Sequence, residues 1–320
     1  MRLIALTGGI GGAKLALGFA KLLTPDEVSF VVNTGDDFEH LGFHISPDVD
    51  TLTYTLAEEA NPETGWGRRD ETWHFMETLE RFGGETWFRL GDRDLALHAF
   101  RRTRLDAGAT LTQVTRELCG KLGIAHDVWP MSDDPVRTRV RTSDGFLAFQ
   151  HYFVRDRCAP AVTGFEFAGI DAAAVNPELV AALREPVRAV VICPSNPFVS
   201  VDPILDIPGM RDLLRGAGAP VIAVSPIIGG QAIKGPTAKM MRELSIPATT
   251  EQVAAHYAGL ITAFVLDEQD ASAQPAVEAM DLDTIVAQTV MGTLQDRVDL
   301  ARTVLDFTDR LRAALRPTAN

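Results

Sequence analysis

Short apolar runs alternate with helical segments at both ends of the chain. The runs are almost wholly hydrophobic, as parallel strands buried on both faces are. They lie at Arg2–Thr7, Val28–Val32, Val187–Cys193, Pro220–Val224 and Leu260–Leu266. Helix-forming residues fill Ala13–Leu23 and Ile207–Ala217, between successive runs. This alternation predicts an α/β fold with a Rossmann-like, doubly wound parallel sheet.

The middle of the chain has a different pattern. It contains all four tryptophans and helical stretches at Asp70–Phe82 and Leu95–Leu122. The alternation in Arg137–Val154 favours a small antiparallel hairpin. We therefore interpret residues 51–167 as an inserted, mostly helical smaller region that covers the active site. Residues 1–50 and 168–320 then form the nucleotide-binding core.

Charge and cysteine content limit the possible partners. The formal net charge of −13 argues against nucleic acid, whose phosphates require a basic surface. A small phosphorylated ligand remains possible if backbone N–H groups, a few basic side chains or a divalent cation help to bind it. The three cysteines are far apart and fit a reducing cytoplasm. The first apolar run is too short for a signal peptide or a membrane span.

The first strand is followed by a glycine-rich turn, Gly8–Lys14, that opens a helix. Glycines permit close approach of the backbone, and the helix N-terminus attracts anions. The turn matches neither standard fingerprint, because Lys14 replaces the third glycine of the dinucleotide motif and Ala13 interrupts the P-loop pattern. Phosphate contact is the favoured interpretation, and a glycine turn needed only for packing is the alternative.

Two acidic turns follow closely, at Asn33–Asp37 and Ser46–Asp50. Neighbouring carboxylates repel each other unless water or a cation relieves them. In an extended backbone, Asp48 and Asp50 would lie on the same side. The pattern favours a magnesium ion held by carboxylate oxygens and substrate phosphates, although a solvated acidic turn remains the alternative.

Three further segments carry polar groups. Trp87–Asp94 combines aromatic rings with arginines and aspartates. Its arginines either bind a phosphate or stack on a ring, or the segment is a surface turn with ion pairs. Pro194–Pro197 and Ser225–Gly230 each follow a buried strand, so both belong at the carboxyl edge where open α/β sheets bind ligands. Lys234 follows the second loop and could reach a phosphate. The sequence shows no nucleophile triad, and phosphoryl transfer needs mainly alignment and charge compensation.

Together these segments resemble a known family. The resemblance rests on Gly8–Lys14, Val32–Asp37, Pro47–Thr51, Gly65–Trp73, Leu90–Asp94, Pro194–Pro197 and Ser225–Gly230, which occur in the same order over about residues 1–310. The chain is identified as a member of the CofD/FbiA family, the 2-phospho-L-lactate transferases of coenzyme F(420) biosynthesis. The resemblance implies a Rossmann-like core, a cytoplasmic homodimer and a Mg²⁺-dependent reaction.

The resemblance also implies the substrates. The donor would be a guanosine diphosphate ester of a small acid, supplied by a partner guanylyltransferase. The acceptor would be the deazaflavin Fo, whose ribityl hydroxyl takes the phospho-acid group while GMP leaves. The acid itself is left open between 2-phospho-L-lactate, phosphoenolpyruvate and 3-phosphoglycerate.

Residue roles follow from the matched motifs. Asp37 and Asp50 are the predicted magnesium ligands and catalytic residues, with Asp36 left open as the closer ligand in place of Asp37. Predicted substrate contacts, toward the deazaflavin, are Asp50, Arg89, Asp92 and Arg93. Predicted nucleotide and phosphate contacts are Gly11, Gly12, Lys14, Ser195, Asn196, Gly229 and Gly230.

Two other classes compete with this interpretation. A YvcK-like regulatory protein would bind a nucleotide sugar without catalysis, and it lacks the combined Pro-Asp-x-Asp and Leu-Gly-Asp-Arg-Asp segments. An NAD-linked dehydrogenase is disfavoured by the imperfect glycine fingerprint and by the clustered aspartates.

Overall fold

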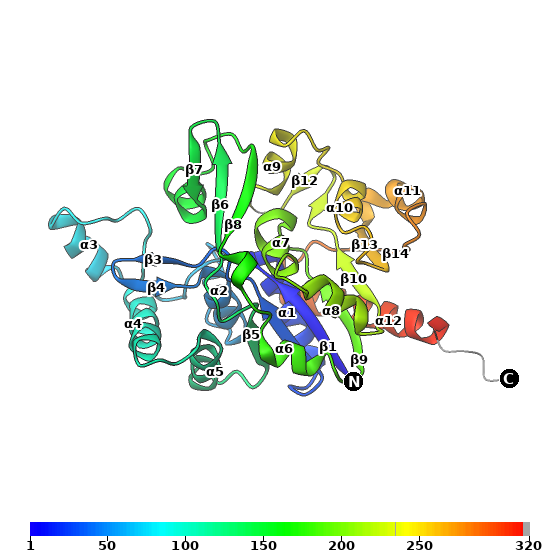
Figure 1. Ribbon diagram of the computed structural model, residues 1–320, viewed down its shortest axis with the longest axis horizontal. Coiled ribbons are helices and arrows are strands. Elements are labelled where there is room, and N and C mark those ends of the chain that lie inside the picture. The colour runs from blue at the N-terminus through cyan, green and yellow to red at the C-terminus, as the bar shows by residue number, and fades with distance from the viewer. Residues whose placement is uncertain (234, 316–320) are drawn as a thin grey trace.

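The computed structural model describes residues 1–233 and 235–315, and a parallel sheet forms its centre (Figure 1). The sheet has seven strands in the order β14-β13-β10-β9-β1-β2-β5. Every neighbouring pair in it is parallel. Its strands are β1 (Arg2–Thr7), β2 (Val28–Val32), β5 (Asp127–Pro130), β9 (Val187–Ile192), β10 (Val221–Val224), β13 (Ala263–Asp267) and β14 (Asp283–Ala287). The predicted α/β fold class is confirmed.

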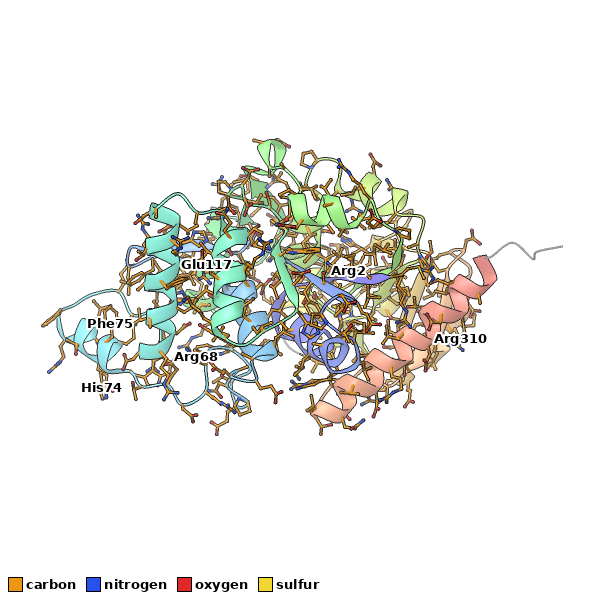
Figure 2. The ribbon with its side chains drawn as sticks, turned by 90° about the horizontal axis from the view of Figure 1, so that it is seen from below. Arg2, Arg68, His74, Phe75, Glu117 and Arg310 are labelled. Atoms are coloured by element: carbon orange, nitrogen blue, oxygen red, sulfur yellow. The ribbon has the colours of Figure 1, made fainter. Side chains whose placement is uncertain are left out.

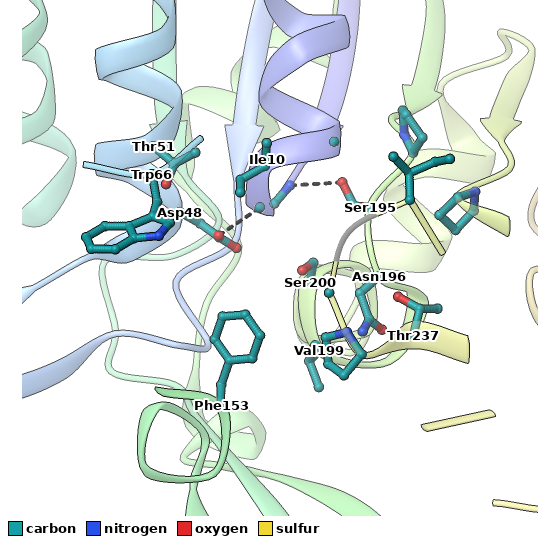
Figure 3. Close-up of a pocket in the computed structure, with 18 of the residues that line it drawn as sticks. Ile10, Asp48, Thr51, Trp66, Phe153, Ser195, Asn196, Val199, Ser200 and Thr237 are labelled. Atoms are coloured by element: carbon teal, nitrogen blue, oxygen red, sulfur yellow. Dashed lines mark hydrogen bonds between the residues drawn. The ribbon is translucent and has the colours of Figure 1, made fainter. Parts of the chain in front are cut away.

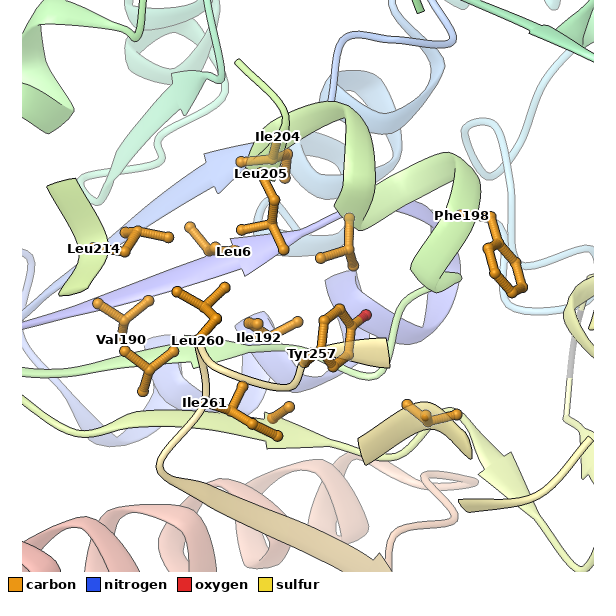
Figure 4. Close-up of a cluster of buried hydrophobic side chains, with 14 of the residues drawn as sticks. Leu6, Val190, Ile192, Phe198, Ile204, Leu205, Leu214, Tyr257, Leu260 and Ile261 are labelled. Carbon is orange, nitrogen blue, oxygen red and sulfur yellow. The ribbon is translucent and has the colours of Figure 1, made fainter. Parts of the chain in front are cut away.

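Alternate residues of the central strands pack into two separate hydrophobic cores, one on each face of the sheet. Leu3 and Ala5 of β1 pack beneath α1 (Gly9–Leu22) and α12 (Leu294–Leu315). Ile4 and Leu6 face the opposite way, toward α7 (Asp202–Leu205) and α8 (Met210–Gly216). Figure 4 shows this second core, where Leu6, Val190 and Ile192 lie below Ile204 and Leu205. Seen from below in Figure 2, α12 runs along the same face as α1. The sheet is therefore covered on both faces.

The remaining elements surround this core. The helices are α2 (Pro47–Leu56), α3 (His74–Arg81), α4 (Asp92–Asp106), α5 (Leu111–Lys121), α6 (Pro177–Ala182), α9 (Thr237–Glu243), α10 (Thr250–His256) and α11 (Gln274–Glu278). Short helical turns are η1 (His151–Arg155), η2 (Ile170–Ala172), η3 (Pro197–Val201) and η4 (Glu268–Ala273); η1 and η3 are π-helical. Minor sheets pair β3 (Phe38–His40) with β4 (Phe43–Ile45) and β11 (Ile227–Ile228) with β12 (Gln231–Ala232). A third joins β7 (Gly145–Ala148), β6 (Arg137–Thr142) and β8 (Gly164–Ala168).

Three details of the middle region differ from the prediction. The stretch Leu95–Leu122 forms two helices, α4 and α5, because the chain turns at Gly108, whose φ is +86°. The predicted hairpin ends at Ala148 and gains β8 as a third strand. Strand β5 lies within the predicted insertion 51–167 yet pairs with β2 at the edge of the central sheet. Residues 51–167 thus supply one strand of the central sheet as well as elements that surround it.

Among the described residues, no helix combines the length and the apolar character that crossing a bilayer requires.

Candidate active site

A cavity of about 410 Å³ opens at the carboxyl ends of the central strands. The turns after β1, β2, β9, β10 and β14 all contribute to its lining. The residues from these turns include Gly8–Gly11, Asp36, Pro194–Asn196, Ser225, Pro226 and Thr289–Met291. Because carboxyl ends of parallel strands share one edge, segments far apart in sequence meet here. Both acidic turns and the first glycine turn thus contribute residues to a single cavity.

The glycine turn forms the floor of the cavity and begins α1. Gly8 N–H donates to Ser195 Oγ over 3.2 Å, and Gly9 N–H donates to Asp48 Oδ1 over 2.7 Å (Figure 3). A Cβ atom placed on Gly11 would lie 2.4 Å from the carbonyl oxygen of Pro194. The loop after β9 therefore packs directly on the first turn of α1, whose leading N–H groups have no partner within the helix. This is the geometry of an anion site at a helix N-terminus.

Gly11→Ala is expected to displace the Pro194 loop and to weaken nucleotide binding by about tenfold or more, since backbone cannot yield as a flexible side chain does. Isothermal titration with a guanine nucleotide and Mg²⁺ measures the change. The control is Gly120→Ala on α5, where an added Cβ meets no atom within 4 Å. Unchanged affinity in a folded Gly11→Ala protein would contradict the proposed role of this turn.

Two carboxylates, Asp36 and Asp48, line the cavity beside the glycine turn. The Nδ2 group of Asn33 lies between them, 3.3 Å from Asp36 Oδ1 and 2.9 Å from Asp48 Oδ2. Burial raises the pKa of Asp48 to about 6. Burial, with the nearby charges of Asp48 and Asp37, raises the pKa of Asp36 well above its usual range. A divalent cation bound by these carboxylates would offset the repulsion between them.

These two carboxylates fit a magnesium site. Within the described part of the chain, no group of three or more His, Cys, Asp or Glu side chains is placed to hold a metal. Mg²⁺ is usually bound by one or two carboxylates, with water and substrate phosphates completing its octahedron. The donor set of Asp36 and Asp48 matches that requirement.

The predicted ligands Asp37 and Asp50 occupy different surroundings. Asp37 Oδ2 accepts a hydrogen bond from Ser46 Oγ at 2.7 Å and lies 2.9 Å from His44 Nε2. Asp50 forms a two-pronged ion pair with the fully buried Arg101 of α4. Neither aspartate is among the cavity-lining residues.

The Pro47–Asp50 segment is helical, because α2 begins at Pro47, so the extended backbone that would put Asp48 and Asp50 on the same side is not present. Residues two apart on a helix point about 200° apart around its axis. Asp48 therefore faces the cavity while Asp50 faces α4. A metal or catalytic role for Asp37 and Asp50 stays a prediction. Asp37 keeps one buried oxygen, Oδ1, without a hydrogen-bond partner, whereas Asp36 and Asp48 are the aspartates that line the cavity.

The three residues predicted as substrate contacts in the Trp87–Asp94 segment, namely Arg89, Asp92 and Arg93, separate in space. Arg89 lines the cavity, and its guanidinium lies 4.3 Å from the centre of the Trp73 ring. Asp92 accepts hydrogen bonds from the backbone N–H groups of His74 and Phe75, so it caps the start of α3. The exposed Arg93 lies outside the cavity lining. Of the three, only Arg89 is placed to touch a ligand there.

Some of the residues predicted to contact the nucleotide line the cavity, and others do not. Gly11, Lys14, Ser195 and Asn196 line the cavity, and Lys14 Nζ donates to the carbonyl oxygen of Met291 over 2.7 Å. Gly12 lies just behind, where a Cβ would come within 2.5 Å of Ser195 Oγ. Gly229 and Gly230 form the turn between β11 and β12, with φ of +55° and +74°, and are outside the lining. Lys234 lies outside the described residues.

Sequence reasoning missed an aromatic wall on one side of the cavity. Its members are Trp66, Phe88, Phe149 and Phe153. Figure 3 shows Trp66 and Phe153 on the Asp48 side, with Ser195 and Thr237 across the cavity. Phe149 and Phe153 stack with their ring centres 5.5 Å apart. These residues come from three separate segments, so only the tertiary fold assembles them.

Comparison with known proteins defines the class as a transferase. The chain matches the family model described as 2-phospho-L-lactate transferase CofD over residues 3–297. It belongs to the CofD family.

Two relatives show how close the similarity is. A phosphoenolpyruvate transferase of Kitasatospora aureofaciens is 39% identical over 319 residues, covering 98% of this chain and 99% of the relative. A 2-phospho-L-lactate transferase of Methanosarcina mazei is 36% identical over 303 residues, covering 95% of this chain and 99% of the relative. A crystal structure of a UPF0052 family protein from Bacillus halodurans covers 95% of this chain and 98% of that one, with a TM-score of 0.62 at 16% identity. This last likeness supports the fold alone.

Proposed function

We propose that this protein transfers a phospho-acid group from its guanosine diphosphate ester to the ribityl hydroxyl of Fo. GMP leaves, and the product is coenzyme F(420)-0 or its dehydro form. The observation that supports this most strongly is the shared cavity, whose lining combines Asp36 and Asp48 with a helix N-terminus and an aromatic wall.

The donor fits the side of the cavity built by the glycine turn and the later loops. The first turn of α1 offers backbone N–H groups to the diphosphate. Ser195, Asn196 and Lys14 add polar groups around it. Because the whole chain carries a net charge of −13, this local concentration of donors is what admits an anionic ligand.

The acceptor fits the opposite side. A deazaflavin is a flat aromatic ring system, and Trp66, Phe88 and Phe153 offer apolar faces for it. The Arg89 guanidinium, held over Trp73, is placed to bind a ring oxygen. Binding there directs the ribityl chain toward Asp48, at the centre of the cavity.

The reaction is a displacement at phosphorus. The hydroxyl oxygen of Fo forms a bond to the phosphorus that carries the small acid, the bond to the bridging oxygen breaks, and that oxygen leaves with GMP. The hydroxyl proton passes to solvent. A bound Mg²⁺ would supply charge compensation to the phosphate oxygens, and Asp36 and Asp48 would hold it. The glycine turn and Lys14 hold the diphosphate, and fixing both reactants in this way can contribute roughly 7–11 kcal/mol.

The relatives' names leave the transferred acid open, since one group acts on phosphoenolpyruvate and another on 2-phospho-L-lactate. We include a homodimer, a partner guanylyltransferase and a cytoplasmic location in the proposal, as the family resemblance implies them.

The test combines the purified protein with Fo, GTP, Mg²⁺, a guanylyltransferase and each candidate acid in turn. Mass spectrometry is expected to show one acid converted to an Fo phosphodiester, with an equal amount of GMP. Omitting Fo is expected to stop GMP release. Tight guanine-nucleotide binding with no Fo product from any acid would overturn the proposal and favour a non-enzymatic, YvcK-like binding protein.

A further inference from the structure

A buried glutamine contacts one of the two cavity carboxylates. Gln150 lies between β7 and η1, is 4% exposed and lines the cavity. Its Nε2 group donates to Asp36 Oδ2 over 3.2 Å and lies 3.5 Å from the Asp36 carbonyl oxygen. The other carboxylate oxygen of Asp36 faces Asn33 Nδ2. Each oxygen of Asp36 is thus oriented by a neutral amide.

Neutral amides suit a carboxylate that must also bind a cation. A lysine or arginine in place of Gln150 would compete with the metal, whereas an amide N–H stabilises the ionised carboxylate without adding charge. A carboxylate oxygen has two lone-pair directions, so it can accept an N–H and still face a cation. Partners that orient a ligand in this way commonly change metal affinity 10–100-fold.

The segment that carries Gln150 also builds the acceptor side. Phe149 precedes it, and Phe153 and Val154 follow on the π-helical turn η1; all three line the cavity. Short π-helical segments recur at functional sites. The six residues Phe149–Val154 therefore contact Asp36, the carboxylate proposed to bind the metal, and also form part of the wall proposed for the deazaflavin.

We propose that Gln150 is a positioning residue that orients Asp36 for the cation and couples cation binding to acceptor binding. This rests on the proposed function for the identity of the acceptor. Fo bound against Phe153 restrains the Phe149–Val154 segment, which holds the Gln150 amide on Asp36. Linkage is reciprocal, so the cation then tightens Fo binding by the same factor as Fo tightens cation binding.

The test uses Gln150→Met, which keeps the length of the side chain and removes its amide. Mn²⁺ serves as the probe, and its dissociation constant is measured by electron paramagnetic resonance with and without Fo. The wild-type protein is expected to bind Mn²⁺ more tightly when Fo is present. The variant is expected to bind Mn²⁺ about 10–100-fold more weakly and to lose the effect of Fo.

Phe153→Leu is the matched control, because it alters the wall of the same segment without touching Asp36. This variant should bind Fo more weakly. Its dissociation constant for Mn²⁺, measured in the absence of Fo, should equal that of the wild type. Gln150→Ala, which lets water reach Asp36, replaces Gln150→Met if that protein does not fold. Wild-type Mn²⁺ affinity in either folded Gln150 variant would overturn the proposal. Absence of Fo turnover by the wild-type protein, with Mn²⁺ binding in the wild type and the variants as expected here, would count against the proposed function and not against the role of Gln150.

Discussion

Asp48→Asn is expected to lower the rate of transfer at least about 100-fold while the protein stays folded. Among the described residues, only Asp48 and Asp36 contribute carboxylates to the cavity lining, so under the proposed function the substitution removes half of the negative charge available to the cation. Charge stabilisation by a bound metal amounts to several kcal/mol, and each 1.36 kcal/mol corresponds to a factor of ten in rate. Asparagine has the same shape and keeps an oxygen for the Gly9 N–H.

Steady-state kinetics with varied Mg²⁺ measures this effect, and thermal unfolding checks the fold. The melting temperature without Mg²⁺ should change little, because the substitution removes a buried charge whose pKa burial has raised to about 6 but also removes the oxygen that accepts from Asn33 Nδ2. Asp212→Asn, at an exposed ion pair with Arg215, is the control and should match the wild type. Transfer within threefold of the wild-type rate in Asp48→Asn would exclude Asp48 as a metal ligand.

Asp50→Ala is expected to destabilise the protein by about 3–5 kcal/mol, because it leaves a buried guanidinium without its carboxylate. Arg101 is fully buried on α4, and its other contacts, with His98 Nδ1 at 3.2 Å and the His44 carbonyl oxygen at 3.3 Å, carry no formal negative charge. Urea unfolding measures the loss of free energy.

A double variant separates the two roles of Asp50. Asp50→Leu combined with Arg101→Met replaces the ion pair by apolar side chains, and such replacements are often neutral or stabilising. The double variant is expected to recover most of the lost stability and to retain transfer activity. A stable double variant without activity would instead support Asp50 as a catalytic or metal-binding residue.

The sequence predicted the sheet well because buried parallel strands are nearly continuous apolar runs. Val28–Val32 has the predicted bounds, and the strand predicted at Val187–Cys193 differs by one residue. Strand β5 was missed because its four residues are too short to form a recognisable run. The loops at Pro194–Pro197 and Ser225–Gly230, predicted to lie at the carboxyl edge of the sheet, both contribute to the cavity there, together with the glycine turn.

Asp50 was chosen over Asp48 from the family resemblance, and the two residues were compared only for an extended backbone. Ser46 followed by Pro47 is typical of a helix start, since proline is favoured in the first turn. That signal would have assigned the two aspartates to opposite faces of α2. The aromatic wall had no comparable signal, because Trp66, Phe88 and Phe153 converge only through long-range packing. Pairing of Asp50 with Arg101, across 51 residues, is a tertiary contact of the same kind.

The position of β1 in the sheet bears on how the chain is synthesised. Leu3 pairs with Val28 on one side and with Ala189 on the other. While the ribosome makes the intervening residues, one edge of β1 has no strand to pair with, and exposed edges promote aggregation. Partners so distant in sequence also slow folding. We therefore expect the nascent chain to depend on chaperones until β9 emerges.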